Sequence, residues 1–284
     1  MSYSIVQANK WPRTLKESAA FALPYEAECC KLFSMIEARD SSVMTLTDDD
    51  GFPHGVFAYT KGKVLLPCLP EKNDDVIDAL QSFLYTHPVF CISGKTEFIN
   101  TVQTALEKTG TQVLKESRDF GFFIREKKSA AETRSPAETE DDVVFVHCGK
   151  KDAQRLIPLQ LDYIREEVLP EEMKLNPAAE RLSLERHLKE GAVYALMTKD
   201  GAFTAKAQIN AQTKNFALVG GVFTAPNFRR RGHAGFLMEN VSRKMEENKK
   251  TAVLFANKSN TAALSLYESC GFVLRSEYKI CYYD

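Results

Sequence analysis

One segment constrains the fold of this 284-residue chain more than any other. Residues 224–235 read Thr-Ala-Pro-Asn-Phe-Arg-Arg-Arg-Gly-His-Ala-Gly. The apolar run before it, at 216–223, predicts a buried strand, and the stretch after it, at 236–241, predicts a helix. The first N–H groups of a helix have no intrahelical partner and carry partial positive charge. Because Gly232 and Ala234 leave the backbone bare and three arginines attract anions, the sequence predicts a pyrophosphate-binding turn.

The strand before this turn contains two consecutive glycines, Gly220 and Gly221. Glycines inside a strand weaken it and often mark a bulge or a close backbone approach. We expect a splayed strand that leaves the amides of Val222, Phe223 and Thr224 unpaired. A bulge that only shapes the core is the alternative.

A second segment, at 260–272, follows the turn in the order and spacing of a known family. Here the chain reads Asn260-x-x-Ala263-x-x-Leu266-Tyr267-x-x-x-Gly271-Phe272, and the turn itself reads Arg229-x-x-Gly232-x-Ala234. Together the two motifs resemble the GNAT superfamily of acyl-CoA N-acyltransferases. The resemblance covers about residues 143–284, and it looks most like an actinobacterial-type group in which a degenerate N-terminal half precedes the catalytic domain.

The resemblance implies that acetyl-CoA is the cosubstrate and that the backbone of the turn grips its phosphates. His233 is then a neighbour of the phosphates, and the matching Asn260 contacts the pantetheine arm or caps its own helix. The implied cofactor contacts are Val222, Phe223, Thr224, Arg229, Arg230, Arg231, Gly232, His233, Ala234, Gly235 and Asn260.

Catalysis needs a proton donor for the departing thiolate and an acceptor for the amine proton. The resemblance implies that Tyr267 is the donor; the alternative is that Tyr267 only packs its helix on the sheet. Several relatives place a Glu five residues before the motif Asn, but this chain has Phe255 there. A water relay, a neutral acceptor amine or another carboxylate must then substitute, and the pool of candidate carboxylates is Glu166, Glu167, Glu171 and Glu172.

The chain divides at residues 127–142, which read KKSAAETRSPAETEDD and contain no side chain that could fill a core. We expect an N-terminal α/β domain at 1–126, a linker at 127–142 and a GNAT domain at 143–284, with an α/β fold around a mixed sheet. The N-terminal domain is compatible with a degenerate GNAT-like half. Its predicted helices lie at 25–38, 74–85 and 96–108, and its predicted strands at 43–46, 56–59, 64–66, 89–92 and 120–125.

The C-terminal domain shows the order β-α-α-β-β-β-α-β-α-β that the resemblance leads us to expect. Its predicted strands lie at 143–148, 192–198, 202–212, 216–224, 251–255 and 272–282, and its helices at 152–167, 178–190, 236–241 and 260–269. The strand at 202–212 alternates, with Lys206, Gln208, Asn210 and Gln212 on one face. That face is either exposed, or it lines the acceptor cleft or meets the N-terminal domain.

The composition of the chain limits which binding partners and metal sites we expect. A net charge of −1 favours neither nucleic acid nor an anionic membrane. None of the seven cysteines forms a C-x-x-C pair, so we expect reduced thiols, no metal site and a cytoplasmic protein without a signal peptide. The run Asp48-Asp49-Asp50-Gly51 predicts a hairpin turn rather than a calcium loop, because its twelfth position is Tyr59.

The leading hypothesis is therefore an N-acetyltransferase that moves an acetyl group from acetyl-CoA to a primary amine in a ternary complex. The acceptor is a small molecule or a protein amine, and a homodimer is compatible with the sequence. A catalytically silent acyl-CoA sensor or regulatory module is the alternative, and Phe255 is the residue that favours it.

Overall fold

The computed structural model describes residues 3–126, 139, 142–169 and 174–284. These residues form two compact units, each described below by itself. The first unit contains Met1–Phe122, Phe255–Ser259 and Leu274–Asp284, and the second contains Phe123–Leu254 and Asn260–Val273. Most of the predicted linker at 127–142 lies outside the described residues.

The second unit carries the element order that the sequence predicts. Its central strands are built from β-branched, aromatic and small apolar residues. Each expected helix is present, but the helix predicted at 236–241 extends from His233 to Glu247. In chain order the elements are β7 (Val143–His147), α5 (Ala153–Tyr163), a π-helical turn (Ile164–Val168), α6 (Pro177–Lys189), β8 (Val193–Thr198), β9 (Phe203–Gln212), β10 (Phe216–Thr224), α7 (His233–Glu247), β11 (Thr251–Asn257), α8 (Thr261–Ser269) and β12 (Phe272–Tyr283).

The strands of this unit form a mixed sheet in the order β11-β10-β9-β8-β7. Neighbouring strands from β7 to β10 pair antiparallel, whereas β10 and β11 pair parallel. The parallel pairing runs from Phe216 opposite Thr251 to Val219 opposite Leu254. The predicted mixed α/β fold is therefore confirmed.

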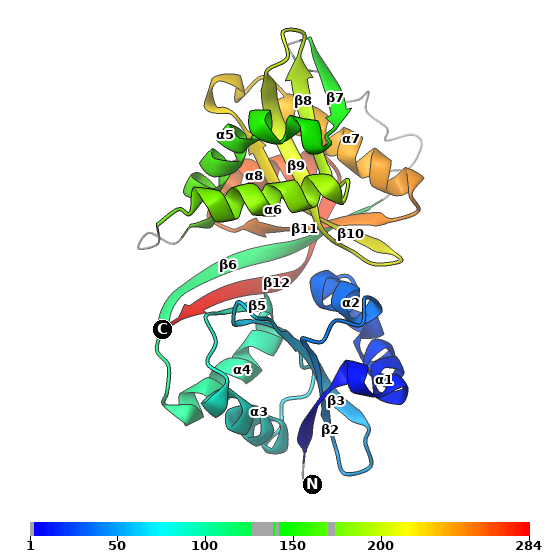
Figure 1. Ribbon diagram of the computed structural model, residues 1–284, viewed down its shortest axis with the longest axis vertical. Coiled ribbons are helices and arrows are strands. Elements are labelled where there is room, and N and C mark those ends of the chain that lie inside the picture. The colour runs from blue at the N-terminus through cyan, green and yellow to red at the C-terminus, as the bar shows by residue number, and fades with distance from the viewer. Residues whose placement is uncertain (1–2, 127–138, 140–141, 170–173) are drawn as a thin grey trace. The chain divides into compact units, whose positions relative to one another are not determined.

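Helices pack on this sheet in layers (Figure 1). Leucines of α5 and α6, among them Leu156 and Leu184, join Val193, Phe203 and Phe223 of the strands in one buried cluster. Helix α7 packs against β8, β9 and β10. This arrangement holds the loop between β10 and α7 at one end of the strands, where a ligand can reach it.

The first unit has its own core. Its elements are β1 (Ser4–Gln7), α1 (Pro12–Ala22), α2 (Cys30–Glu37), β2 (Val43–Thr47), β3 (Pro53–Tyr59), β4 (Val64–Cys68), α3 (Asp74–Thr86), β5 (Cys91–Lys95), α4 (Thr96–Thr109) and β6 (Leu114–Arg125). Together with β12, its strands lie in the order β1-β2-β3-β4-β5-β12-β6. Helix α1 and strand β1 were not predicted, because the N-terminal segment has few large apolar residues at helical or alternating spacing.

The prediction of a strand at 89–92 was wrong at its N-terminal end. Strand β5 begins only at Cys91, because the backbone N–H and C=O of Val89 are both hydrogen bonded to the Gln112 side chain instead of a neighbouring strand. The predicted hairpin turn at Asp48 is confirmed. The Asp48 carboxylate accepts hydrogen bonds from the amides of Asp50 and Phe52, and Gly51 adopts a φ of +83°.

The end of β12 completes the first unit. It pairs antiparallel with β5, from Tyr278 opposite Lys95 to Tyr282 opposite Cys91. Cys281 and Tyr283 are buried in the core of that unit. The last residues of the chain therefore stabilise a unit whose other strands mostly come from the N-terminal half.

Candidate functional site

The loop between β10 and α7 has the backbone geometry of an anion site. Gly232 is the N-cap of α7 with a φ of +81°, and Arg230 also lies in the left-handed region at +64°. The Gly232 cap makes no side-chain hydrogen bond to this end of the helix, and the first N–H groups of a helix have no intrahelical partner. A non-glycine residue at positive φ costs free energy and is found at sites where function demands it.

The two glycines of β10 mark a bulge, and its pairing with β11 ends before them. That the amides of Val222, Phe223 and Thr224 are unpaired stays a prediction. The register between β9 and β10 passes from Gly220 opposite Gln208 directly to Phe223 opposite Lys206. Gly221 has a φ of +57°, and the parallel pairing with β11 stops after Val219. Phe223 and Thr224 are thus back in register with β9, and it is the Gly221–Val222 peptide that the bulge leaves outside the register.

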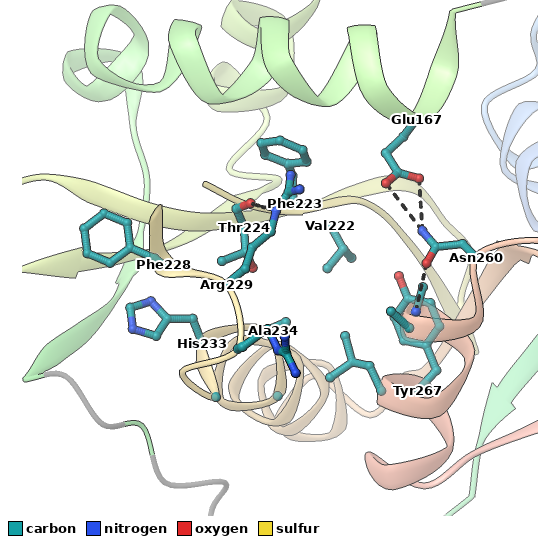
Figure 2. Close-up of a pocket in the computed structure, with 16 residues that line it drawn as sticks. Glu167, Val222, Phe223, Thr224, Phe228, Arg229, His233, Ala234, Asn260 and Tyr267 are labelled. Carbon is teal, nitrogen blue, oxygen red and sulfur yellow. Dashed lines mark hydrogen bonds between the residues drawn. The ribbon is translucent and has the colours of Figure 1, made fainter. Parts of the chain in front are cut away.

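A cavity of about 460 Å³ lies in the second unit between the loop, the bulged strand and the start of α8 (Figure 2). All of the expected cofactor contacts except Arg231 line it, and so does Tyr267. The Arg231 guanidinium lies instead 5.6 Å from the centre of the Phe228 ring. Glu167, one of the four candidate carboxylates, also lines it. The lining residues that the sequence did not assign to cofactor binding or catalysis are Phe228, Ala262, Ala263 and Leu266.

The side chain of His233 contacts the sheet. Its ring is buried, and its Nδ1 lies 2.8 Å from the hydroxyl of Thr204 on β9. This contact ties the first residue of α7 to the sheet. The phosphate contact expected of His233 stays a prediction.

Asn260 has two contacts that use both ends of its amide. Its Oδ1 accepts a hydrogen bond of 3.0 Å from the Ala263 amide, so the helix-cap interpretation is confirmed. Its Nδ2 donates to the carboxylate of Glu167, at 3.2 Å and 3.4 Å (Figure 2). Contact with a cofactor stays a prediction.

Tyr267 is buried on the wall of the cavity. Burial raises the pKa of its phenol well above the usual value, and the nearby Tyr163 and Glu167 raise it further. The phenol therefore keeps its proton throughout the neutral range and can serve as a donor.

The π-helical turn after α5 brings two carboxylates to the cavity region. Glu167 lines the cavity, whereas Glu166 forms a 2.6 Å ion pair with Arg229. The Nε of Arg229 also donates to the carbonyl oxygen of Thr224 at 3.0 Å. The other two candidate carboxylates, Glu171 and Glu172, lie outside the described residues.

Phe255, which stands where several relatives have Glu, has a packing role in the first unit. Its ring stacks on Tyr278 with centroids 3.7 Å apart and also contacts Phe122. An aromatic side chain here joins three strands and offers no group that could accept a proton. The described residues contain no group of three or more His, Cys, Asp or Glu side chains that could hold a metal ion.

The polar face of β9 is not an exposed surface over its whole length. Lys206 and Gln208 are buried, and neither lines the cavity, whereas Gln212 remains exposed. The interpretation of an exposed face was therefore wrong for Lys206 and Gln208. Alternation indicates which side chains share a face, but it does not indicate what packs on that face.

Comparison with known proteins agrees with this geometry. Residues 188–281 match the family model described as FR47-like protein, which is GNAT-related. The chain has the GNAT fold. A GNAT-family acetyltransferase from Colwellia psychrerythraea aligns with a TM-score of 0.61 at 12% identity, covering 100% of this chain and 99% of that one. A GCN5-related N-acetyltransferase from Sphaerobacter thermophilus aligns with a TM-score of 0.62 at 12% identity, covering 98% and 94%.

The GNAT fold also accounts for both halves of the chain. A tandem GNAT protein from the clavulanic acid biosynthesis pathway aligns with a TM-score of 0.59 at 9% identity, over 99% of this chain and 97% of that one. Its two-half layout fits the expected GNAT-like N-terminal half. No curated protein matches the chain by sequence. Among the described helices, none is both long and apolar enough to cross a membrane.

Proposed function

We propose that this protein is an N-acetyltransferase that moves an acetyl group from acetyl-CoA to a primary amine. One observation carries the proposal: a single cavity joins the uncapped start of α7, the bulge of β10 and the buried phenol of Tyr267. An anion site, strand amides and a proton donor are the parts that thioester aminolysis requires.

The residues present fit acetyl-CoA. The start of α7 at Gly232–Gly235, which has no side-chain cap, and the guanidinium of Arg229 suit a pyrophosphate. Arg229 is held by Glu166, so a bound phosphate would compete with that carboxylate for it. The bulged strand offers the Gly221–Val222 peptide to an extended pantetheine arm and its thioester.

Glu167 and Tyr267 supply the two proton transfers. The Glu167 carboxylate takes a proton from the acceptor amine as its nitrogen forms the C–N bond with the acyl carbon. The C–S bond then breaks, and Tyr267 gives its proton to the departing thiolate. Both side chains line the same cavity, and the protonated Glu167 returns its proton to the Tyr267 phenolate to complete the cycle. The net change is one proton moved from amine to thiol.

An acyl-CoA sensor without catalytic activity is the second candidate. The packing role of Phe255 favours it, because the carboxylate that several relatives carry there is missing. Glu167 favours the enzyme, because it places a carboxylate on the same cavity as Tyr267. The two functions bind the same cofactor and differ only in turnover.

Calorimetry with acetyl-CoA, followed by thiol release with a panel of primary amines, tests the proposal. We expect binding by the native chain and none by Gly232→Glu, because a carboxylate at the start of α7 repels the pyrophosphate and a side chain at φ +81° is strained. Gly149→Glu is the matched control, because a Cβ there meets nothing within 4 Å.

Four outcomes are informative. Binding with thiol release on one amine class supports the enzyme and names its acceptor. Binding without release on any amine favours the sensor. Unchanged affinity in Gly232→Glu would remove the loop from the cofactor site, and absence of binding by the native chain would overturn both functions.

A further inference from the structure

Lys206 is a buried lysine in the middle of the sheet of the second unit. Its exposed fraction is 0%, and it stands on β9 between Ala195 of β8 and Phe223 of β10. Lysine is almost never fully buried unless its ammonium has a partner. The position of Lys206 therefore needs a reason beyond packing.

The partner of Lys206 is the bulge of β10. Its Nζ donates a 3.0 Å hydrogen bond to the carbonyl oxygen of Gly221 and lies 4.6 Å from the centre of the Tyr163 ring. That carbonyl belongs to the same peptide group as the N–H of Val222, and Val222 lines the cavity. One peptide thus has its oxygen on a buried amine and its N–H on a residue of the cavity wall.

Gln208 packs close to the same peptide. A Cβ built on Gly221 would lie 2.9 Å from the Cγ and Cδ atoms of Gln208, so this side chain lies directly against the Gly221 backbone. Lys206 and Gln208 both come from β9 and both contact Gly221. Together they hold a peptide that the strand register leaves out of the sheet.

We propose that Lys206 is a positioning residue, which fixes and polarises the Gly221–Val222 peptide so that the Val222 N–H stabilises the oxyanion formed on the acyl carbon. The inference rests on the proposed function. A hydrogen bond from an ammonium to a carbonyl withdraws electron density from that oxygen, and the amide N–H at the other end of the same peptide becomes a stronger donor. Oxyanion donors act most strongly when they are held in place before the reaction.

The protonation state of Lys206 connects this role to pH. Burial lowers its pKa to about 7, while the negative charge of Glu180 on α6 opposes the change. The titratable groups that face Lys206 are Glu180 from α6 and the phenol of Tyr163 from α5. Since the ammonium is the stronger donor, the contribution of Lys206 is present below a pH of about 7 and weakens as pH rises through that value.

The test replaces Lys206 by Met, which keeps the volume of the side chain and removes its donor. We expect Lys206→Met to lower kcat by about 10-fold, part of the effect of an oxyanion donor, with acetyl-CoA affinity changed far less. The control is Lys214→Met, which removes an exposed lysine of the same unit. The kcat of the native chain should fall as pH rises through about 7, because Lys206 loses its proton there. The kcat of Lys206→Met should not show this fall.

A second measurement does not depend on turnover. In the native chain labelled with ¹⁵N-valine, we expect the Val222 amide resonance to titrate with a midpoint near 7, and we expect this titration in Lys214→Met but not in Lys206→Met. If Lys206→Met does not fold, the titration of the Val222 amide resonance in the native chain alone tests the inference. A Val222 resonance that ignores pH between 5.5 and 9, or a Lys206→Met enzyme with native kcat and pH profile, overturns the inference.

Failure of the proposed function is distinguishable from failure of this inference. Absence of acetyl-CoA binding by the native chain removes the function, whatever Lys206 does. Native turnover combined with an unaffected Lys206→Met variant leaves the function in place and removes only the role of Lys206.

Discussion

At the scale of single residues, the proposed chemistry rests on two side chains of the cavity wall, Tyr267 as proton donor and Glu167 as proton acceptor. Tyr267 keeps its proton because it is buried, and Glu167 is near enough to raise the pKa of that phenol further. Asn260 donates to both oxygens of Glu167 and so orients the carboxylate toward the cavity. A donor and an acceptor of protons are therefore present without the carboxylate that Phe255 replaces.

Substitutions at these two residues test this division of roles. We expect Tyr267→Phe and Glu167→Gln each to lower turnover by at least about 10-fold, because general acids and bases contribute 10²-fold or more. Affinity for acetyl-CoA measured by calorimetry should change little in either variant. Glu167→Gln preserves the contact with Asn260 through its amide oxygen, so its effect reports on the proton rather than on packing.

Each substitution has a matched control. Tyr194→Phe removes a second buried phenol from the same unit, away from the cavity lining, and Glu185→Gln changes an exposed carboxylate of that unit that does not line the cavity. Neither should lower turnover. Full activity in Tyr267→Phe would show that this tyrosine only packs its helix. Full activity in Glu167→Gln would show that Glu167 is not the base and that the acceptor amine enters the site already neutral.

At the scale of elements, the decisive feature is the bulge in β10. It ends the pairing with β11 and moves one peptide out of the ladder. Two glycines allow it. Gly221 adopts a positive φ, and a Cβ on Gly220 would collide with the side chain of Asn210. A strand of ordinary residues at these positions would pair along its whole length and close the site.

Gly221→Ala tests the bulge as an element. A side chain at φ +57° costs roughly 1–2 kcal/mol, and overpacking against Gln208 adds about 1–3 kcal/mol. Gly191→Ala is the control, because Gly191 has a φ of +65° in the same unit and its nearest neighbour is 3.4 Å away. We expect denaturant unfolding to show a larger loss for Gly221→Ala, with weaker acetyl-CoA binding only in that variant. Equal losses of unfolding free energy in the two variants would mean that the Gln208 side chain moves aside without cost.

At the scale of the whole molecule, the chain does not divide at one point. Strand β12 begins after the motif helix of the second unit and ends in the core of the first. The stability of the first unit therefore depends on residues that follow the GNAT motifs in the sequence.

Cys281→Asp tests this dependence. Cys281 is fully buried in the first unit, and an unpaired carboxylate there should cost at least about 3 kcal/mol of unfolding free energy. Leu274→Asp lies on the same strand but is 49% exposed, so we expect a change within about 0.5 kcal/mol. Hydrogen exchange should show lost protection in β5 and α4 for Cys281→Asp. Native protection of those elements would show that the C-terminal strand is dispensable.

The site was predicted from the sequence wherever the signal is local. A bare-backbone turn, a pair of glycines in a strand and a cap residue before a helix each impose their geometry on the few residues around them. The anion turn at 229–235, the bulge at Gly220 and the cap at Asn260 were therefore read from neighbouring residues, and so was the order of strands and helices in the second unit.

Tertiary structure alone decided which distant residues meet. Glu167 comes to the cavity because α5 ends in a π-helical turn opposite Asn260, 93 residues further along the chain. Lys206 is buried because α5 and α6 cover its face of the sheet, and β12 reaches β5 although the two are far apart in sequence. Such contacts depend on packing between distant segments, and the sequence of one segment does not indicate which other segment it contacts. The sequence by itself thus determined the local backbone geometry of the turn before α7. The fold decided which of the candidate carboxylates lines the cavity, which lysine is buried and which unit the last strand completes.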